Sequence, residues 1–289
     1  MRRQSNSLLV IAGLILVSLA GAFLPLVWPR AGVERAPAST PLIANGRTPA
    51  LSPDGKLAAF VEEGIGVRLL TLDAKNVRPL SESTPQDRFP AFSTDGASIA
   101  VIRGSGPASQ VCILPSSGGL SRCIAKTPHA AGLDWTRNDK HLIVSFRPSE
   151  SESPALFLIE VATGRSQRLS PSPASDEWPC VSARGRAVAF VRDGSYWVYE
   201  ITGDPPTIRR KRKLTAPAAP VSYPAGWSTD SRFLYFASAG KLWRLGFNGR
   251  ARPELLAGVD GATGAVAVAR SGRRLVYETA EGLSLLEGF

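Results

Sequence analysis

The stretch Ser52-Pro53-Asp54-Gly55 recurs along the chain, and its recurrence decides the fold. Five further copies or variants follow it: Ser93-Thr94-Asp95-Gly96, Thr136-Arg137-Asn138-Asp139, Ser182-Ala183-Arg184-Gly185, Ser228-Thr229-Asp230-Ser231 and Ala269-Arg270-Ser271-Gly272. Successive copies begin 41 to 46 residues apart. A near-constant period of this size predicts a repeat architecture. Each copy has the composition of a tight turn, because Pro presets φ and Gly adopts a positive φ without a steric clash.

Each turn is followed by a short apolar run, which predicts a strand that is buried on both faces. These runs cover residues 57–61, 99–102, 142–146, 188–191, 233–236 and 275–277. We expect one strand before each turn and a second hairpin after it, as at 195–199 and 240–245. Stacking such sheets around a ring covers their apolar faces. The sequence therefore predicts an all-β fold, a six-bladed β-propeller of four-stranded antiparallel blades over residues 41–289.

The last repeat is one strand short, because only the apolar run at 283–286 precedes Phe289. Pro41-Leu42-Ile43-Ala44 stands before the first repeat without a partner of its own. We expect this N-terminal strand to complete the final blade and close the ring, which removes two exposed sheet edges.

The N-terminal part contains an uncharged apolar stretch from Leu8 to Trp28, long enough to span a bilayer. Two interpretations stay open. Ala20-Gly21-Ala22 fits the cleavage site of a signal peptide, whereas the apolar stretch continues to Trp28, where an interfacial anchor residue belongs. We expect a short cytoplasmic N-terminus (1–7), a transmembrane anchor or signal sequence (8–28) and a linker (29–40). The propeller would then lie in the periplasm or outside the cell, anchored to the membrane or, after cleavage, secreted.

The formal net charge of +10 raises the question of a nucleic-acid or anionic partner. Most Lys and Arg residues are scattered singly along the repeats, so we expect no nucleic acid. The exception, residues 209–213, is interpreted as a solvated outer strand or loop. The 3 Cys and 2 His have no metal-binding spacing, and no cofactor is expected.

The repeats resemble those of TolB-type propellers, which are relatives of the WD repeat. The resemblance is carried by a seven-residue pattern that precedes an apolar strand: Pro, any residue, an apolar residue, Ser, either Pro or Thr, Asp, and Gly. The pattern occurs at 49–55 and 90–96 and, nearly as well, at 224–230. It covers residues 41–289. In the third, fourth and sixth repeats the turn departs from the pattern, and the match rests on spacing and the following strand. The resemblance implies a periplasmic or surface-exposed binding platform.

The sequence contains no G-x-S-x-G nucleophile motif, which favours a non-catalytic binding or sensing module. The alternative is a hydrolase or lactonase-type propeller enzyme with a small ligand or a metal in the central channel. Such an enzyme would gather carboxylates at the channel, for which the sequence offers Asp87, Asp134, Asp176 and Asp260.

A candidate binding site follows from the alternation of the strands, which puts the loops before each first strand on one face. Three of these loops end in an aromatic residue and Pro: Phe89-Pro90, Trp178-Pro179 and Tyr223-Pro224. Aromatic and Arg side chains are typical of protein recognition. We therefore expect a protein or peptide partner at the channel mouth, bound by Asp87, Arg88, Phe89, Asp176, Glu177, Trp178 and Tyr223. Alternatively, each aromatic side chain only packs on a Pro between blades.

The three cysteines divide into a pair and a single thiol. If the second hairpin of the second repeat turns about Ser117-Gly118, Cys112 faces Cys123 across an antiparallel pair, at a distance that a disulfide accepts. A bulge at Gly119 would shift this register by one residue. We expect the disulfide to form in an oxidising compartment, with Cys180 left as a buried thiol.

Overall fold

The computed structural model describes residues 39–171, 175–214, 221, 223–247 and 252–289. The predicted N-terminus and the anchor or signal segment, residues 1–28, lie outside the described residues, as does most of the linker. Within the described residues, no helix has the length and apolar character needed to cross a membrane. Strands dominate these residues, and their one helical element is the 3-10 turn η1 (Gly106–Ala108).

Four sheets have four antiparallel strands each, paired in sequence order. The first contains β2 (Gly46–Leu51), β3 (Leu57–Glu62), β4 (Gly66–Thr71) and β5 (Asn76–Pro79). The second contains β6 (Asp87–Phe92), β7 (Ser98–Arg103), β8 (Gln110–Pro115) and β9 (Arg122–Lys126). The third contains β10 (Leu133–Trp135), β11 (His141–Phe146), β12 (Ala155–Glu160) and β13 (Ser166–Arg168). The fourth contains β14 (Glu177–Val181), β15 (Ala187–Arg192), β16 (Ser195–Thr202) and β17 (Thr207–Lys213).

The remaining sheet has seven strands, in the order β1-β23-β22-β21-β20-β19-β18. They are β1 (Ser39–Ala44), β18 (Gly226–Trp227), β19 (Phe233–Ser238), β20 (Gly240–Gly246), β21 (Glu254–Val268), β22 (Arg274–Thr279) and β23 (Gly282–Glu287). The first residues of β21 pair with β20 and its last residues pair with β22. If β21 is divided between these pairings, the sheet becomes two four-stranded groups. The count of six blades depends on this division and stays a prediction.

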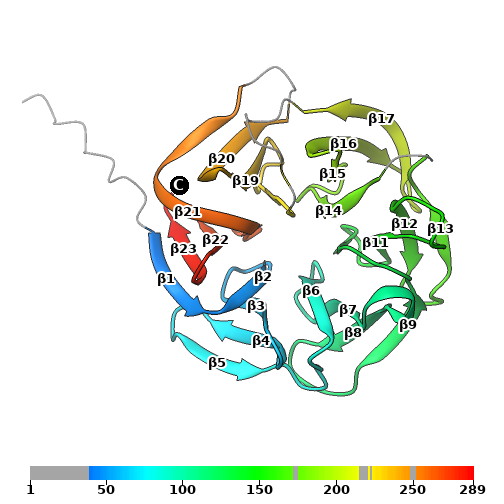
Figure 1. Ribbon diagram of the computed structural model, residues 1–289, viewed down its shortest axis with the longest axis horizontal. Coiled ribbons are helices and arrows are strands. Elements are labelled where there is room, and N and C mark those ends of the chain that lie inside the picture. Colours follow the sequence, from blue (N-terminus) through cyan, green and yellow to red (C-terminus); the bar gives the residue numbers. More distant parts are fainter. Residues whose placement is uncertain (1–38, 172–174, 215–220, 222, 248–251) are drawn as a thin grey trace, which may run out of the picture. The chain divides into compact units, whose positions relative to one another are not determined.

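The sheets follow one another around a common centre (Figure 1). First strands such as β2, β6 and β14 are innermost, and last strands such as β5, β9 and β17 are outermost. The long strand β21 runs from the outer side to the centre. The predicted all-β propeller architecture of repeated four-stranded antiparallel sheets is confirmed.

The ring is closed by the N-terminal strand. Strand β1 pairs antiparallel with β23, with Ser39 opposite Leu286 and Ala44 opposite Gly282. In Figure 1 the two ends of the described chain therefore lie side by side. The closure expected from Pro41-Leu42-Ile43-Ala44 is confirmed.

The repeated turns are held by one set of hydrogen bonds. The Ser52 hydroxyl donates to Asp54 Oδ1 at 2.6 Å, and the Lys56 N–H donates to the same oxygen at 3.1 Å. The Leu57 N–H donates to Ser52 Oγ at 2.9 Å, at the start of the next strand. The Ser52 hydroxyl bond lowers the pKa of Asp54. The same arrangement recurs in the turns that begin at Ser93, Thr136 and Ser228.

The glycine of the turn meets two requirements. Gly55 and Gly185 have φ values of 72° and 69°, which glycine adopts without steric cost. A Cβ atom at Gly185 would lie 2.4 Å from Arg137 Cβ, and one at Gly55 would lie 3.1 Å from Ala269 Cβ. Both contacts are with a turn of the neighbouring repeat. Gly55 and Gly185 thus pack closely against side chains of the neighbouring turn, in contacts that a larger residue would disturb.

Neighbouring sheets are joined by apolar clusters and by tryptophan side chains. One cluster joins Ile102 and Val111 of the second sheet to Leu142 of the third. The Trp135 indole N–H donates to the carbonyl of Ala91 at 2.9 Å, 44 residues earlier in the chain. The Trp227 indole N–H donates likewise to the carbonyl of Cys180 at 2.9 Å. Each indole therefore connects the first strands of two different sheets.

The cysteines are arranged as the hairpin register indicates. Cys112 in β8 lies opposite Cys123 in β9, and a disulfide joins the two residues. The register shift in this pair falls between Val111 and Cys112, so it leaves the two cysteines opposed. Cys180 in β14 is a free, half-buried thiol.

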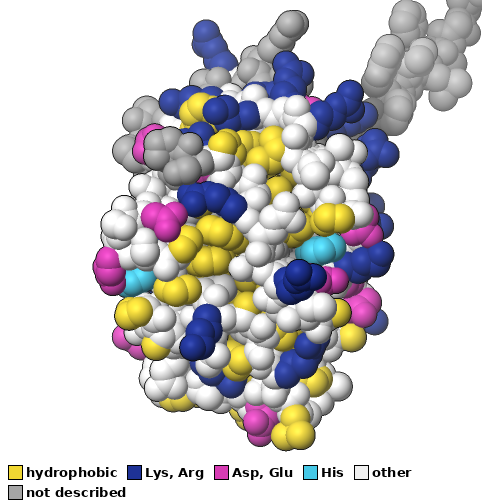
Figure 2. Space-filling view, turned by 90° about the vertical axis from the view of Figure 1, so that its right-hand side faces the viewer, with side chains coloured by type: hydrophobic (Ala, Val, Ile, Leu, Met, Phe, Trp, Pro, Cys, Tyr) yellow, Lys and Arg dark blue, Asp and Glu magenta, His cyan; other side chains and the backbone are white. Residues whose placement is uncertain are grey.

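The positive charge is spread over the surface. On the face shown in Figure 2, Lys and Arg side chains are distributed from top to bottom, with hydrophobic side chains between them. The basic run at 209–213 falls in β17, the outermost strand of its sheet, and most of its residues are exposed. This position agrees with its interpretation as a solvated outer strand.

Candidate functional site: the central channel and its mouth

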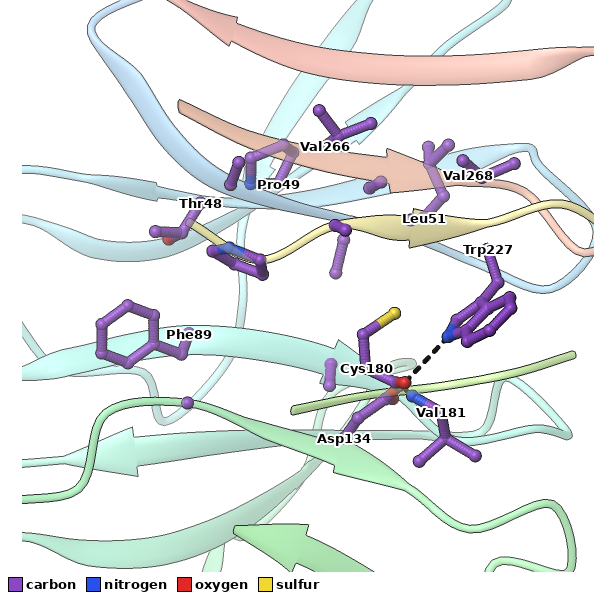
Figure 3. A pocket seen from close by; sticks show the side chains of 18 of the residues that line it. Thr48, Pro49, Leu51, Phe89, Asp134, Cys180, Val181, Trp227, Val266 and Val268 are labelled. Carbon is purple, nitrogen blue, oxygen red and sulfur yellow. Dashed lines mark hydrogen bonds between the residues drawn. The ribbon is translucent and has the colours of Figure 1, made fainter. Parts of the chain in front are cut away.

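The first strands of the sheets enclose a cavity of about 150 Å³, here called the channel. Its walls come from β2, β6, β10, β14 and β18, and from the last residues of β21. Because these strands belong to equivalent places in the repeats, their side chains form layers around one axis. Figure 3 shows Thr48 and Phe89 toward one end of the channel and Trp227 and Val268 toward the other.

Each layer contains one residue from every repeat, counted back from the turn. The layer four residues before the turn, here called the mouth, contains Thr48, Phe89, Gly132, Trp178, Pro224 and Ala265. The next layer contains Pro49, Pro90, Leu133, Pro179, Ala225 and Val266. The third contains Ala50, Ala91, Asp134, Cys180, Gly226 and Ala267. Arg270 lines the channel beyond these layers, at the end nearest the turns, here called the inner end.

The backbone at the mouth has an unusual conformation. Thr48, Phe89 and Trp178 have φ values of 44°, 54° and 57°, although each precedes a proline. Residues before proline favour extended backbone, and a non-glycine residue with positive φ is strained by about 1 to 3 kcal/mol. Each of the three residues also lies within a register shift between the first and second strands of its sheet. Such bulges turn a side chain away from its regular direction, here toward the channel.

The aromatic residues of the mouth contact one another across a glycine. The rings of Phe89 and Trp178 pack edge to face, with centroids 5.0 Å apart. They come from the second and fourth sheets, and Gly132 is the equivalent residue of the third. A Cβ atom on Gly132 would lie 3.2 Å from Trp178 Cα, and the φ of Gly132 is 125°. The glycine therefore leaves space for the two rings to meet above the channel.

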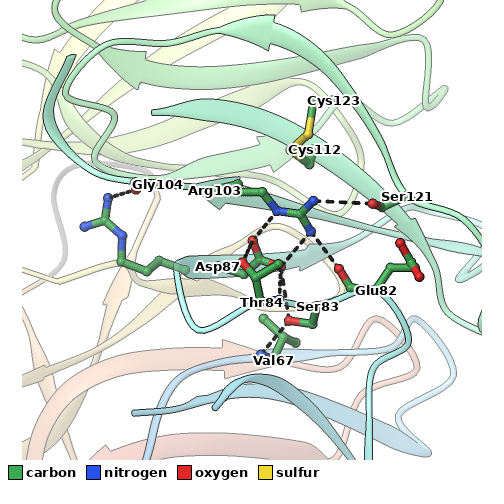
Figure 4. Close-up of polar contacts among 11 residues, drawn as sticks. Val67, Glu82, Ser83, Thr84, Asp87, Arg103, Gly104, Cys112, Ser121 and Cys123 are labelled. Carbon is green, nitrogen blue, oxygen red and sulfur yellow. Dashed lines mark hydrogen bonds and ion pairs between the residues drawn. A yellow bond between two sulfur atoms is a disulfide. The ribbon is translucent and has the colours of Figure 1, made fainter. Parts of the chain in front are cut away.

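Asp87, which the sequence suggested as a partner-binding residue, has a structural role. Its side chain is fully buried and forms a bidentate ion pair with Arg103, at 2.7 and 3.0 Å (Figure 4). It also accepts hydrogen bonds from the hydroxyl and the N–H of Thr84 and from the Ser83 hydroxyl. A carboxylate without solvent exposure is held within the fold, and a contact between Asp87 and a partner stays a prediction.

Asp176 has the same environment beside the fourth sheet, and its contact with a partner likewise stays a prediction. It is fully buried and forms a bidentate ion pair with Arg192, at 2.6 and 2.8 Å. The Tyr199 hydroxyl accepts from Arg192 at 2.7 Å and donates to Asp176 at 3.2 Å. Burial raises the pKa of Tyr199 to about 12, so this hydroxyl keeps its proton at neutral pH.

The other predicted residues lie at the edge of the site. Arg88 donates to the Gly104 carbonyl at 2.7 Å and lies over the Phe89 ring at 5.5 Å. Glu177 accepts from the Ser175 hydroxyl at 3.2 Å. Tyr223 is 43% exposed and does not line the channel, because Pro224, one residue later, occupies the position equivalent to Phe89. The register of β18, with Trp227 opposite Leu234, fixes this offset.

Three polar side chains face the channel below the mouth. Asp134 accepts hydrogen bonds from the backbone N–H groups of Trp135 at 2.8 Å and of Val181 at 2.6 Å. Burial raises the pKa of Asp134 to about 6, although the Arg270 charge lowers it. Burial, with the Asp134 charge, raises the pKa of the Cys180 thiol well above its usual value. The thiol is therefore protonated at neutral pH.

The carboxylates proposed for an enzymatic channel do not converge. Of the four, Asp134 lines the channel, whereas Asp87 and Asp176 are held in buried ion pairs. Asp260 is exposed and paired with Lys241. Within the described residues, no group of three or more His, Cys, Asp or Glu side chains could hold a metal ion.

Sequence reasoning did not identify Thr48, Gly132 or Arg270 as parts of the site. Their shared signal is position, because each stands at a fixed offset from the repeated turn. Aligning the repeats on the turn gives the layers, but the inward direction of the side chains depends on bulges that the sequence pattern does not reveal.

Comparison with known proteins identifies a relative in sequence. No protein-family model matches the chain. A TolB homologue of Chlorobium chlorochromatii is 31% identical over 119 residues, which are 41% of this chain and 26% of that protein. The matched region thus spans about a quarter of the length of that relative.

Solved structures show the same fold at lower identity. TolB from Acinetobacter baumannii has a TM-score of 0.61 and 18% identity, over 75% of this chain and 55% of that one. A putative TolB from Agrobacterium tumefaciens has a TM-score of 0.63 and 18% identity, over 85% and 91%. A gluconolactonase from Xanthomonas campestris has a TM-score of 0.68 and 11% identity, over 84% and 86%. The chain thus resembles TolB proteins in part of its repeat sequence and shares their β-propeller fold.

Proposed function

We propose that the chain is a non-catalytic extracytoplasmic propeller that binds a protein or peptide segment at the mouth of its channel. The observation that carries this proposal is the strained bulge shared by Thr48, Phe89 and Trp178. Strained backbone persists where the surrounding structure enforces it, and it clusters at functional sites. Here it turns two large aromatic side chains toward one opening.

The chemistry of the mouth suits a polypeptide. The two aromatic rings provide apolar contact area at low entropic cost, and the guanidinium of Arg88 lies beside one of them. Prolines 49, 90 and 179 follow the mouth residues and stiffen the backbone that carries them. A rigid aromatic rim of this kind resembles the anchor positions of protein interfaces, in which a few aromatic and Arg residues supply most of the affinity.

The proposed location rests on three supports. The likeness to TolB proteins favours the periplasm. The disulfide between Cys112 and Cys123 fits an oxidising compartment. The apolar stretch from Leu8 to Trp28 would tether the propeller to the membrane or, if cleaved, direct its secretion.

The enzyme alternative has less support. Propeller enzymes occur among the structural relatives, including a gluconolactonase and an oligogalacturonate lyase, but their identities of 11% and 12% show the fold alone. Asp134 is the one carboxylate among the described residues that lines the channel. A single carboxyl group offers neither the acid-base pair nor the ligand set that channel chemistry of this kind requires.

The proposal is tested by selecting peptides from a random library on the folded protein and measuring their affinity for variants. Trp178→Ala and Phe89→Ala should each weaken a selected peptide at least tenfold. Leu120→Ala is the matched control, because Leu120 is 85% exposed and does not line the channel. Equal affinity for Trp178→Ala, Phe89→Ala and Leu120→Ala would overturn the proposal.

A further inference from the structure

The inner end of the channel contains Arg270, which has no carboxylate partner among the residues that the structure describes. Arg270 follows β21, is half-buried and lines the channel wall. Its Nη1 donates to the Thr94 hydroxyl at 3.0 Å, which connects two turns 176 residues apart in the chain. Unlike Arg103 and Arg192, it makes no ion pair with a carboxylate of the described residues. A guanidinium has five N–H donors, so the hydrogen bond to Thr94 leaves others that can bind a ligand.

The nearest acid in the channel is not available to neutralise Arg270. Both oxygens of Asp134 are engaged by backbone N–H groups, at 2.8 and 2.6 Å, so its carboxylate is held by the backbone. The Arg270 charge nevertheless affects the ionisation of both Asp134 and Cys180, which places the three groups in one electrostatic environment. The thiol is neutral, so Arg270 and Asp134 are the charges that a ligand in the channel would meet.

The walls between the mouth and Arg270 are mostly apolar. Pro90, Leu133 and Val266 are examples, and the cavity of about 150 Å³ accommodates a side chain or a short tail rather than a folded segment. An occupant must therefore be narrow and largely apolar, with one anionic end. A dianion such as phosphate fits poorly, because Asp134 shares the cavity and repels a second negative charge.

We propose that the channel accepts a narrow apolar group that ends in a carboxylate, and that Arg270 binds this carboxylate at the inner end. The carboxylate belongs to a monocarboxylic acid or to the bound peptide of the proposed function, as its C-terminus or an acidic side chain. Only the peptide source rests on that proposed function. Arginine suits the role because its planar fork of donors matches a carboxylate.

Cys180 provides a reporter that lies within the channel. It is the one free thiol of the 3 cysteines, because Cys112 and Cys123 form a disulfide. Its rate of modification by the small neutral reagent methyl methanethiosulfonate is measured by mass spectrometry on the native protein. An occupant of the channel should slow this reaction. Hexanoate and hexanamide are the probes, because they have nearly the same shape and differ in charge.

We expect hexanoate to slow the modification of Cys180 at least fivefold at saturation, and hexanamide to leave it unchanged. Arg270→Gln should raise the hexanoate concentration for half-protection at least tenfold, and Arg270→Lys should raise it less. Arg137→Gln is the matched control, because Arg137 occupies the same turn position in the third repeat and is exposed. Near-UV circular dichroism checks that each variant keeps its tertiary structure.

The pH dependence of hexanoate binding provides a second test of the inference. The titratable and charged groups that interact electrostatically with Asp134 are Arg270, Asp139 and Cys180. A bound carboxylate near Asp134 favours its protonated form, so hexanoate should bind more weakly as the pH rises through about 6. Asp134→Asn should remove most of this dependence.

Equal protection by hexanoate and hexanamide, or protection unchanged in Arg270→Gln, would overturn the inference. For a peptide selected at the mouth, amidation of its C-terminus or replacement of its acidic residues by amides identifies the source of the carboxylate. A selected peptide that depends on Trp178 but not on Arg270, with no hexanoate effect, would refute this inference and leave the proposed function intact. Hexanoate protection that depends on Arg270, without any peptide binding at the mouth, would support this inference and refute the proposed function.

Discussion

Replacing Asp176 by Ala removes the only carboxylate that is paired with Arg192 within the described residues. The Asp176 side chain is 0% exposed and the Arg192 side chain 8%, so water cannot replace the lost partner. The variant keeps a guanidinium whose remaining neighbours are the Tyr199 hydroxyl and the rings of Phe190 and Trp197. Breaking a buried ion pair on one side costs about 3 to 5 kcal/mol. We expect Asp176→Ala to lose about 4 kcal/mol of unfolding free energy, a large fraction of the total for a domain.

Urea unfolding, followed by tryptophan fluorescence, measures this loss. In the double variant Asp176→Leu/Arg192→Met, at least half of the lost stability should return, because apolar side chains of similar volume replace a buried ion pair at little cost. Asp87→Ala is the comparison, and it should lose only about 2 kcal/mol, because the Arg103 side chain is 19% exposed and water screens its charge. A loss below about 1 kcal/mol for Asp176→Ala, with no recovery in the double variant, would refute the assignment of Asp176 to a structural role.

Three other changes test separate parts of the structure. Thr48→Gly should raise the free energy of unfolding by about 1 kcal/mol, because glycine relieves a φ of 44° and the variant loses a buried hydroxyl that has no hydrogen-bond partner among the described residues. Thermal unfolding measures this change, and destabilisation would refute the strain argument. Deleting residues 41–46 removes the strand that pairs with β23 and should cost several kcal/mol or cause aggregation; an unchanged melting temperature would contradict ring closure by β1. The third change is Asp134→Asn. The pKa of Asp134 is about 6 in the folded protein and about 3.9 in the unfolded chain, so its contribution to stability falls as the pH rises through this range. Between pH 4 and 7 the difference in unfolding free energy should therefore move by about 2 to 3 kcal/mol in favour of the variant. Urea unfolding measures this difference, and a constant value would count against the raised pKa.

The propeller architecture could be predicted from the sequence because the repeat fixes the turns, the buried strands and the hairpin register together. Gly55 and its equivalents serve both the turn and the contact with the neighbouring turn, so the motif recurs wherever the ring requires it. The apolar runs matched strands because each is buried on both faces, as β11 is along its whole length. The partnership of Cys112 and Cys123 followed from hairpin symmetry alone.

The site was less predictable because it depends on local departures from regular strands. Asp87 and Asp176 stand next to aromatic residues in sequence, but the bulge that turns Phe89 and Trp178 inward leaves the acids facing Arg103 and Arg192 within their sheets. Each of these acids precedes its Arg by 16 residues, and this spacing within one repeat was the available signal for an ion pair. Tyr223 lies one residue before the position that lines the channel, and the sequence step of an aromatic residue and Pro does not reveal this offset without the strand register.

The central claim is that the mouth of the channel binds a polypeptide, and photo-cross-linking tests it most directly. A peptide selected on the folded protein, carrying a benzophenone at its centre, is cross-linked to the protein and the adducts are located by mass spectrometry. The account predicts adducts on the segments that contain Phe89 and Trp178, and their loss when unlabelled peptide competes. Adducts confined to the outer strands β5, β9, β13 and β17, or to the face of the turns, would contradict it.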